Sequence, residues 1–258
     1  MKIRKEVLAI IIVFLIFSFL FSFISIKRHN NFESQGWDLA LYDQVIWLYS
    51  QGKNPYSTLT QRLDFADRFR PILLVLVPFY WLKADVKILL VLQAIILASG
   101  VFPAFFLAKR ILKSFFTALA ISLAYVLFPG IQSFIIDDFH EMVFFPPLLL
   151  WLFYFFFNRR KRWFFLFLLL CLLIREHLGF FLSSVGLYLM SISKKEKKIG
   201  FISIIFSLAW SITIIWLIMP LFGEFRYKDA GAENERLEQT ILRYFSNPLQ
   251  TFSLAVMP

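Results

Sequence analysis

Long apolar stretches alternate with short polar segments along most of this chain. The stretches cover Val7–Ile26, Ile88–Ala108, Phe115–Ile136, Met142–Phe157, Trp163–Ile192 and Ile199–Leu221. Most of them approach the ~20 residues that a helix needs to cross the hydrocarbon core of a bilayer. The pattern therefore predicts an all-α polytopic membrane protein, with the lipid bilayer as its first partner.

The composition agrees with this prediction, since 59% of the residues are hydrophobic, 34 are Phe and the mean hydropathy is +0.71. The first stretch follows Lys2, Arg4 and Lys5, as a signal peptide would. It is too long for one, however, and Lys27-Arg28-His29 offers no small-residue cleavage site. We predict a retained first helix. The single cysteine, Cys171, excludes a disulfide within the chain and a cysteine-based metal site.

The formal charge of +10 raises the possibility of a nucleic-acid partner, which the distribution of the charge argues against. Four clusters between the apolar stretches hold 14 of the 27 Lys and Arg residues, with only Glu6 and Glu196 as acids: residues 2–6, 109–113, 159–162 and 194–198. The positive-inside rule places such clusters in the cytoplasm. We expect a protein of the cell membrane with a cytoplasmic N-terminus and no nucleic-acid partner.

Placing all four clusters on one side predicts about seven transmembrane helices. Ile72–Leu82 has 11 residues, too few to span, and is expected to lie as a helix on the outer membrane surface. Trp163–Ile192 must start and end inside, so it is expected to form two short helices with a break at Arg175-Glu176-His177.

The whole chain, 1–258, is then a single transmembrane module. Residues 27–87 form a long first extracytoplasmic loop that carries juxtamembrane helices, and residues 223–250 form a second long outer segment. The last residues resemble the start of another hydrophobic element, so we expect a sequence truncated at its C-terminus.

The first loop contains a short amphipathic helix after Gly36, with Trp37, Tyr42 and Trp47 as predicted anchors at the membrane interface. Asp38 is either a functional carboxylate on this helix or simply its N-cap. Farther along, Asp64, Asp67, Arg68 and Arg70 precede Pro71. Their arginines suit an anionic phosphate, although an Asp-Arg network facing lipid headgroups is an equal alternative.

Two more charged segments lie between apolar stretches. Asp137-Asp138-Phe139-His140-Glu141 is either a solvated loop or a functional cluster, in which Asp138 and Glu141 share a helix face and join His140 around a divalent cation. Arg175-Glu176-His177 is either a neutralised hinge or part of a site, since ionisable residues at membrane depth are costly. Together these segments predict a cavity on the outer face.

Motifs of soluble nucleotide chemistry and of common hydrolases are absent from the sequence. Several segments instead resemble the DUF2079 type of predicted prokaryotic membrane proteins. The resemblance covers essentially the whole chain and rests on Trp37-Asp38-Leu-Ala-Leu-Tyr-Asp43-Gln44, Asp67-Arg68-Phe-Arg70-Pro71-Ile-Leu-Leu, Pro103 with Leu107-Ala-Lys-Arg110, Asp138-Phe-His140, and Arg175-Glu176.

That family is similar to the GT-C glycosyltransferases, which implies sugar transfer from a polyprenyl-phosphate donor to an unknown extracytoplasmic acceptor, with inversion. By this resemblance Asp38 is the catalytic base and Arg68 and Arg70 hold the lipid phosphate. The other expected substrate-binding residues are Asp43, Asp67, Asp138, His140, Glu141, Arg175 and Glu176.

Three positions depart from the pattern: Arg68 replaces a His, Ala40 replaces a Gly, and His177 stands where an acid is expected. The first and third weaken the case for a shared metal site, so any cofactor beyond a possible divalent cation stays open. The alternative function is a non-enzymatic protein of lipid or polysaccharide transport or assembly. The two functions differ in whether Asp38 is needed for turnover or only for folding.

Overall fold

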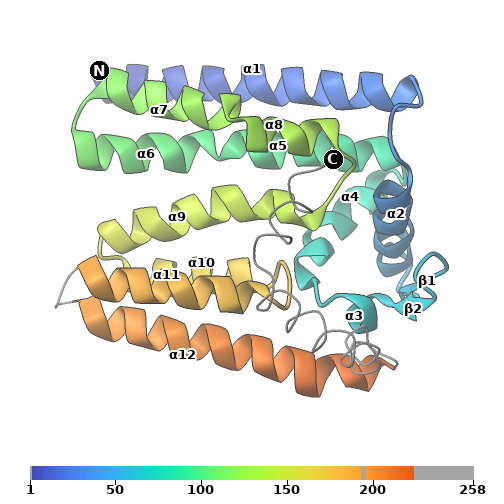
Figure 1. The fold of residues 1–258 in the computed structure, drawn as a ribbon. Helices are drawn as coiled ribbons and strands as arrows, with labels where there is room; N and C mark the ends of the chain where they lie inside the picture. Colours follow the sequence, from blue (N-terminus) through green and yellow to red (C-terminus); the bar gives the residue numbers. More distant parts are fainter. Residues whose placement is uncertain (1, 193–195, 224–258) are drawn as a thin grey trace, which may run out of the picture.

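The protein is a bundle of long, roughly parallel helices with a layer of shorter elements across one end (Figure 1). This computed structural model describes residues 2–192 and 196–223. The bundle helices are α1 (Lys2–Asn30), α5 (Val86–Ser99), α6 (Val101–Leu112), α7 (Phe115–Leu127), α8 (Pro129–Ile136), α9 (Phe145–Phe157), α10 (Lys161–Leu172), α11 (Leu178–Ile192) and α12 (Lys197–Thr213).

Several helices are broken for identifiable reasons. α7 ends where Pro129 follows Phe128, because proline lacks an N–H and disfavours a helical residue before it. α5 and α6 meet at Gly100, where the ring of Tyr125 occupies the space that a side chain would need. α12 continues through a π-helical turn, Ile214–Ile218, and a 3₁₀ turn, Met219–Phe222.

Four helical stretches are long and apolar enough to cross a membrane: Lys5–Asn30, Val86–Leu112, Phe115–Ile136 and Lys197–Phe222. They coincide with four predicted spans. The shorter apolar helices Glu141–Phe157 and Leu178–Ile192 also lie where helices were expected, and the chain breaks between α10 and α11 at residues 173–177, as predicted. A total of seven spans stays a prediction.

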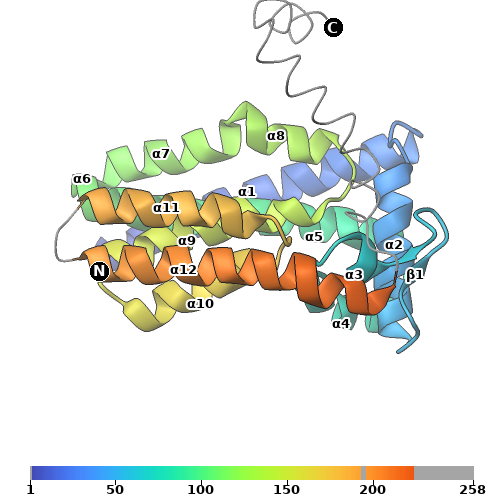
Figure 2. The same ribbon diagram turned by 60° about the horizontal axis from the view of Figure 1, so that its bottom comes forward.

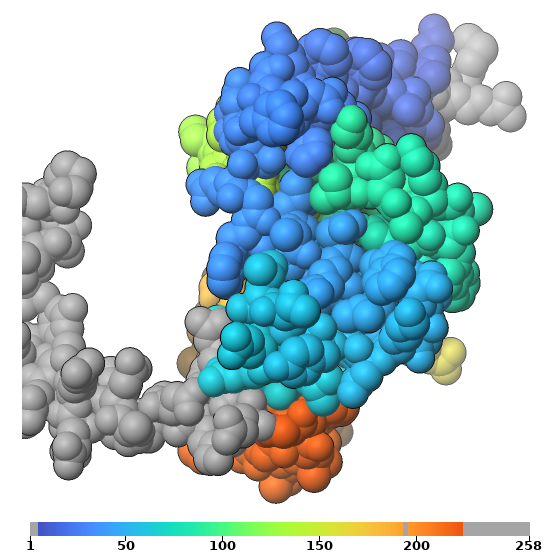
Figure 3. All heavy atoms as spheres, turned by 90° about the vertical axis from the view of Figure 1, so that its right-hand side faces the viewer, coloured from blue at the N-terminus to red at the C-terminus, as the bar shows by residue number. Residues whose placement is uncertain are grey.

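The first predicted outer loop forms a layer that we call the α2 end. It contains α2 (Trp37–Ser50), the two-residue strands β1 (Tyr56–Ser57) and β2 (Arg62–Leu63), which pair antiparallel, α3 (Asp64–Asp67), the 3₁₀ turn η1 (Pro71–Leu76) and α4 (Val77–Leu82). α2 runs across the direction of the bundle helices (Figure 1), and this layer covers most of the face in Figure 3.

The described basic clusters gather at the opposite end, which we call the basic end. The α6–α7 and α9–α10 connections, the end of α11 and the starts of α1 and α12 all lie there (Figure 1). The Lys109 ammonium pairs with the Glu6 carboxylate across two of these segments. The predicted segment 223–250 and the C-terminal residues lie outside the described part of the chain, apart from Gly223.

α11 and α12 pack with their backbones close together. A side chain at Gly186 or Gly200 would collide with the facing backbone, and one at Gly179 would meet Ser207 and Ser211. Small residues of this kind let helices approach closely where no hydrophobic effect drives them together. This contact fixes the loop before α11, which carries Arg175 and Glu176.

Candidate functional site

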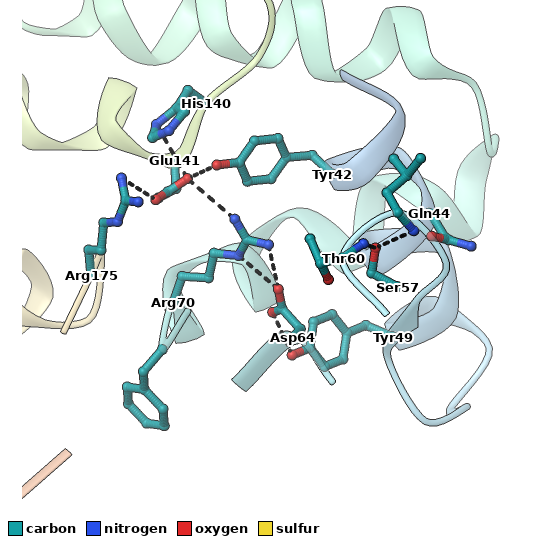
Figure 4. Close-up of polar contacts among 12 residues, drawn as sticks. Tyr42, Gln44, Tyr49, Ser57, Thr60, Asp64, Arg70, His140, Glu141 and Arg175 are labelled. Carbon is teal, nitrogen blue, oxygen red and sulfur yellow. Dashed lines mark hydrogen bonds and ion pairs between the residues drawn. The ribbon is translucent and has the colours of Figure 1, made fainter. Parts of the chain in front are cut away.

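A fully buried carboxylate, Glu141, lies at the centre of the α2 end (Figure 4). It accepts a hydrogen bond from the Tyr42 hydroxyl. The Nη1 atoms of Arg175 and Arg70 lie 3.5 and 3.9 Å from its oxygens. Glu141 begins the 3₁₀ turn η2 (Glu141–Phe144) before α9, while its partners come from α2, the segment before η1 and the α10–α11 loop. One side chain thus joins four distant segments.

Arg70 extends this cluster to a second buried carboxylate. Its Nε and Nη2 atoms lie 2.8 and 2.6 Å from Oδ1 of Asp64, whose other oxygen accepts from the Tyr49 hydroxyl at 3.0 Å. Burial, the largest single cause, lowers the pKa of Arg70, but Asp64, Tyr42 and Glu141 together outweigh it, and the net change is upward. We call this set the Glu141 network: Tyr42, Tyr49, Asp64, Arg70, Glu141 and Arg175.

The tyrosines of the network come from the buried face of α2. Leu39, Tyr42, Ile46 and Tyr49 follow the three- and four-residue spacing of one helix face, which packs toward the bundle. The prediction of Tyr42 as a membrane anchor is wrong, because only 1% of this residue is exposed. Burial, and then the adjacent carboxylates, raise the pKa of both tyrosines, so each stays a donor.

His140 lies between this network and the solvent. Its Nδ1 accepts a hydrogen bond from the Met142 N–H at 3.2 Å, and burial lowers its pKa. We therefore assign the neutral imidazole with its hydrogen on Nε2. In this tautomer the 3.3 Å approach of Nδ1 to Glu141 is a contact between two acceptors and not a hydrogen bond.

Glu176 forms a second buried contact. It accepts from the Phe69 N–H at 3.0 Å, and Arg68 lies 3.5 Å from its other oxygen. The Ser211 hydroxyl donates to its main-chain carbonyl. The α10–α11 loop is thereby tied both to the segment before η1 and to α12, which confirms none of the expected substrate roles but fixes the loop's position.

An acidic pocket of about 550 Å³ opens beside His140. Its lining comprises Gln35, Trp37, Asp38, Phe134, Asp137, Asp138, His140 and Met142. Asp138 accepts from the Gly36 N–H at 2.8 Å, which joins the two loops that form the pocket.

Asp38 is exposed and lies in the first turn of α2, where the helix dipole stabilises a carboxylate. The interpretation of Asp38 as the N-cap is wrong. Gly36, in the left-handed region at φ 82°, occupies the cap, and no side chain caps this helix.

The predicted site residues thus separate into groups. Asp38, Asp138 and His140 share the acidic pocket, whereas Arg70, Glu141 and Arg175 belong to the network, and Arg68 pairs with Glu176. Asp43 accepts from the Tyr80 hydroxyl at 2.6 Å, and Asp67 is buried on α3. Neither of these two aspartates lines the acidic pocket.

Two further expectations fail. Asp138 and Glu141 do not share a helix face, because Asp138 lies in the extended segment before η2 while Glu141 turns inward. Among residues 2–192 and 196–223, no group of three or more His, Cys, Asp or Glu side chains is placed to hold a metal ion. The described residues therefore offer no group of ligands for the divalent cation that the sequence suggested.

Sequence reasoning missed Tyr42 and Tyr49 as members of the network, and it placed the Asp-Arg alternative of Asp64 and Arg70 at the lipid headgroups, whereas this pair is buried. The signal for the tyrosines was their spacing of seven residues on the apolar face of α2, where a hydroxyl needs a buried partner. Nothing local distinguishes Asp64 from Asp67, because only the tertiary position of Arg70 selects between them.

Comparison with known proteins gives one family match. The model of the family described as "Predicted membrane protein (DUF2079)" matches residues 28–253, which includes both the acidic pocket and the Glu141 network. No curated protein matches the chain. No solved structure matches it either.

Proposed function

Because the chain belongs to the DUF2079 family of predicted membrane proteins, and because it holds an exposed carboxylate in a pocket at one end of its bundle, we propose that it is a membrane glycosyltransferase. It transfers a sugar from a polyprenyl-phosphate donor to an extracytoplasmic acceptor, with inversion at the anomeric carbon. The α2 end then faces away from the cytoplasm.

The observation that carries this proposal is that the Asp38 carboxylate is exposed and has no hydrogen-bond or ion-pair partner among the described residues. Asp43, Asp64 and Glu141 have their oxygens engaged by tyrosine or arginine side chains. Asp38 makes no hydrogen bond or ion pair among the described residues and faces the acidic pocket. A general base must reach the hydroxyl that it deprotonates, so an exposed, unengaged carboxylate suits this role. Asp137 also lines the pocket, and the resemblance to the glycosyltransferases, in which a first-loop carboxylate serves the reaction, favours Asp38 over it.

In the proposed reaction Asp38 takes the proton of the acceptor hydroxyl. The acceptor oxygen forms the new bond to the anomeric carbon on the face opposite the phosphate, and the bond from that carbon to the phosphate oxygen breaks. The electron pair leaves with the polyprenyl phosphate, whose charge needs guanidinium partners. Arg70 is 2% exposed and is held by Asp64. Arg68 and Arg175, with 14% and 17% of their side chains exposed, are therefore better placed to bind the leaving phosphate.

The test follows radiolabel from a panel of polyprenyl-phosphate sugars into a membrane extract, using the purified protein and its Asp38→Asn variant. We expect the variant to fold and insert normally but to lose about 10²–10⁴-fold in transfer, the usual contribution of a general base. The matched control is Asp85→Asn, an acid of the α2 end that caps α5 and keeps its acceptor oxygen as Asn.

Normal turnover by Asp38→Asn would remove this residue from the mechanism. A folded protein that neither binds nor turns over any donor of the panel would overturn the transferase proposal. That result would favour the transport or assembly function.

A further inference from the structure

An apolar groove of about 840 Å³ runs between α6, α7, α8 and α9. Its lining carries no charged residue, and the hydroxyl of Tyr125, its one polar group, donates to the Leu97 carbonyl. Small residues, Ala104, Ala108, Ala124 and Gly130, leave the space open. α7 and α8 run along one side of the bundle in Figure 2. A groove of this lining at the depth of membrane helices suits a hydrocarbon chain.

The groove meets the acidic pocket at Phe134, near the end of α8, which lines both. On the facing element, Met142 lines the pocket and Pro146, one turn later, lines the groove. From Ile121 to Phe134 the groove wall extends roughly 20 Å at ~1.5 Å per residue. A polar pocket and a long apolar groove therefore lie next to each other, an arrangement that suits an amphiphilic ligand.

The charge of the pocket restricts the head of this ligand. Asp38, Asp137 and Asp138 contribute three carboxylates, and the lining holds no lysine or arginine. His140 is neutral and offers one N–H donor. Arg28, near the pocket, is bound to Glu33 at 3.3 Å and to the Ile136 carbonyl at 3.2 Å. A phosphate here would face like charges without compensation, whereas O–H and N–H donors would find acceptors.

We propose that the acidic pocket and the apolar groove bind one amphiphile, with an uncharged or cationic head rich in hydroxyl or amine donors and a single hydrocarbon chain. The identity of this ligand rests on the proposed function: it is the acceptor, and its hydroxyl contacts Asp38. The donor phosphate then lies on the other side of His140, toward the arginines. The acceptor is a lipid that enters sideways from the membrane between α7 and α9, and not a soluble molecule.

The experiment measures equilibrium binding to the protein in lipid nanodiscs, with two probes of equal chain length: a neutral alkyl glycoside and an alkyl phosphate. We expect the glycoside to bind about tenfold more tightly or better, a difference near 1.4 kcal/mol. Ala124→Trp fills the groove and should weaken glycoside binding by about tenfold or more. Ala120→Trp, one turn earlier on α7 and exposed outside the groove lining, is the matched control and should bind normally.

Equal or tighter binding of the alkyl phosphate would overturn the proposal, and so would unchanged binding by a folded Ala124→Trp variant. Failure of the transferase proposal gives a different result. In that case the protein still binds the glycoside selectively, but no radiolabel is transferred to an acceptor. Transfer that depends on Asp38 but is insensitive to Ala124→Trp would instead retain the transferase and reject the lipid acceptor.

Discussion

At the scale of single residues, the α2 end contains two kinds of charged cluster, one buried and neutralised and one open to solvent. In the Glu141 network two carboxylates, Asp64 and Glu141, face two guanidinium groups, Arg70 and Arg175, so the charges balance. Removing one partner of such a buried set typically costs about 3–5 kcal/mol. The acidic pocket leaves its carboxylates unbalanced and open to solvent, which suits a ligand and not a structural core.

His140 predicts a pH dependence of stability. Its pKa is lowered in the folded protein, so below the unfolded value of about 6.5 the unfolded chain binds a proton that the folded chain does not. Stability should therefore fall as the pH drops from about 6.5 toward the lower folded pKa. The imidazole is surrounded by Glu141, Arg175, Asp38 and Arg70.

His140→Asn is the variant that tests this effect, because Asn keeps an acceptor for the Met142 N–H and does not titrate. Thermal unfolding in detergent between about pH 5 and 7.5 should show a smaller loss of stability for the variant than for the wild type. The same pH dependence in both proteins would show that another group titrates there.

At the scale of elements, the end of α8 decides where the acidic pocket lies. The last carbonyls of a helix lack partners within it. Here three consecutive carbonyls accept from neighbouring helices: Phe134 from Gln93 of α5, and Ile135 and Ile136 from Ser25 and Arg28 of α1. α1 and α5 thereby hold the segment that presents Asp137, Asp138 and His140.

Ser25→Ala should destabilise the protein by about 1–3 kcal/mol, because it leaves the buried Ile135 carbonyl without its donor. Ser18→Ala is the matched control, seven residues earlier on α1, since the buried Ser18 hydroxyl has no hydrogen-bond partner among the described residues. It should be neutral or stabilising. Chemical or thermal unfolding of both variants in detergent gives the comparison, and equal effects would reject the role of the Ser25 bond.

At the scale of the whole molecule, charge is separated along the bundle. The described basic clusters lie at the basic end, while the carboxylates of the pocket and the network lie at the α2 end. The positive-inside rule predicts that the basic end faces the cytoplasm. The central span Val86–Leu112, with 67% of its apolar window buried against 11% for Lys5–Asn30, connects the two ends.

A thiol-labelling experiment tests this orientation. Lys83→Cys at the α2 end should react with a membrane-impermeant maleimide in intact cells, whereas Lys161→Cys at the basic end should react only after permeabilisation. Wild type is the control, because its single cysteine, Cys171, is buried. The reverse accessibility would invert the topology and place the acidic pocket in the cytoplasm.

The amino-acid pattern alone predicts the helical membrane class and the positions of the long helices, because in lipid an apolar run of about twenty residues satisfies its backbone hydrogen bonds by forming a helix. It also predicts a break at Arg175-Glu176-His177, which lies within the observed break at residues 173–177, since charged side chains are costly at membrane depth. These features follow from local composition and from the solvent.

Which charged residues neutralise one another, and which remain available to a ligand, became visible only in the folded arrangement of the helices. Asp38 and Asp43 are five residues apart in sequence, yet one is open to the pocket and the other is bound to Tyr80. Glu141 and Asp138 diverge in the same way, toward the arginines and toward Gly36. Pairing between residues 34 to 102 positions apart depends on how helices pack, which local spacing does not encode.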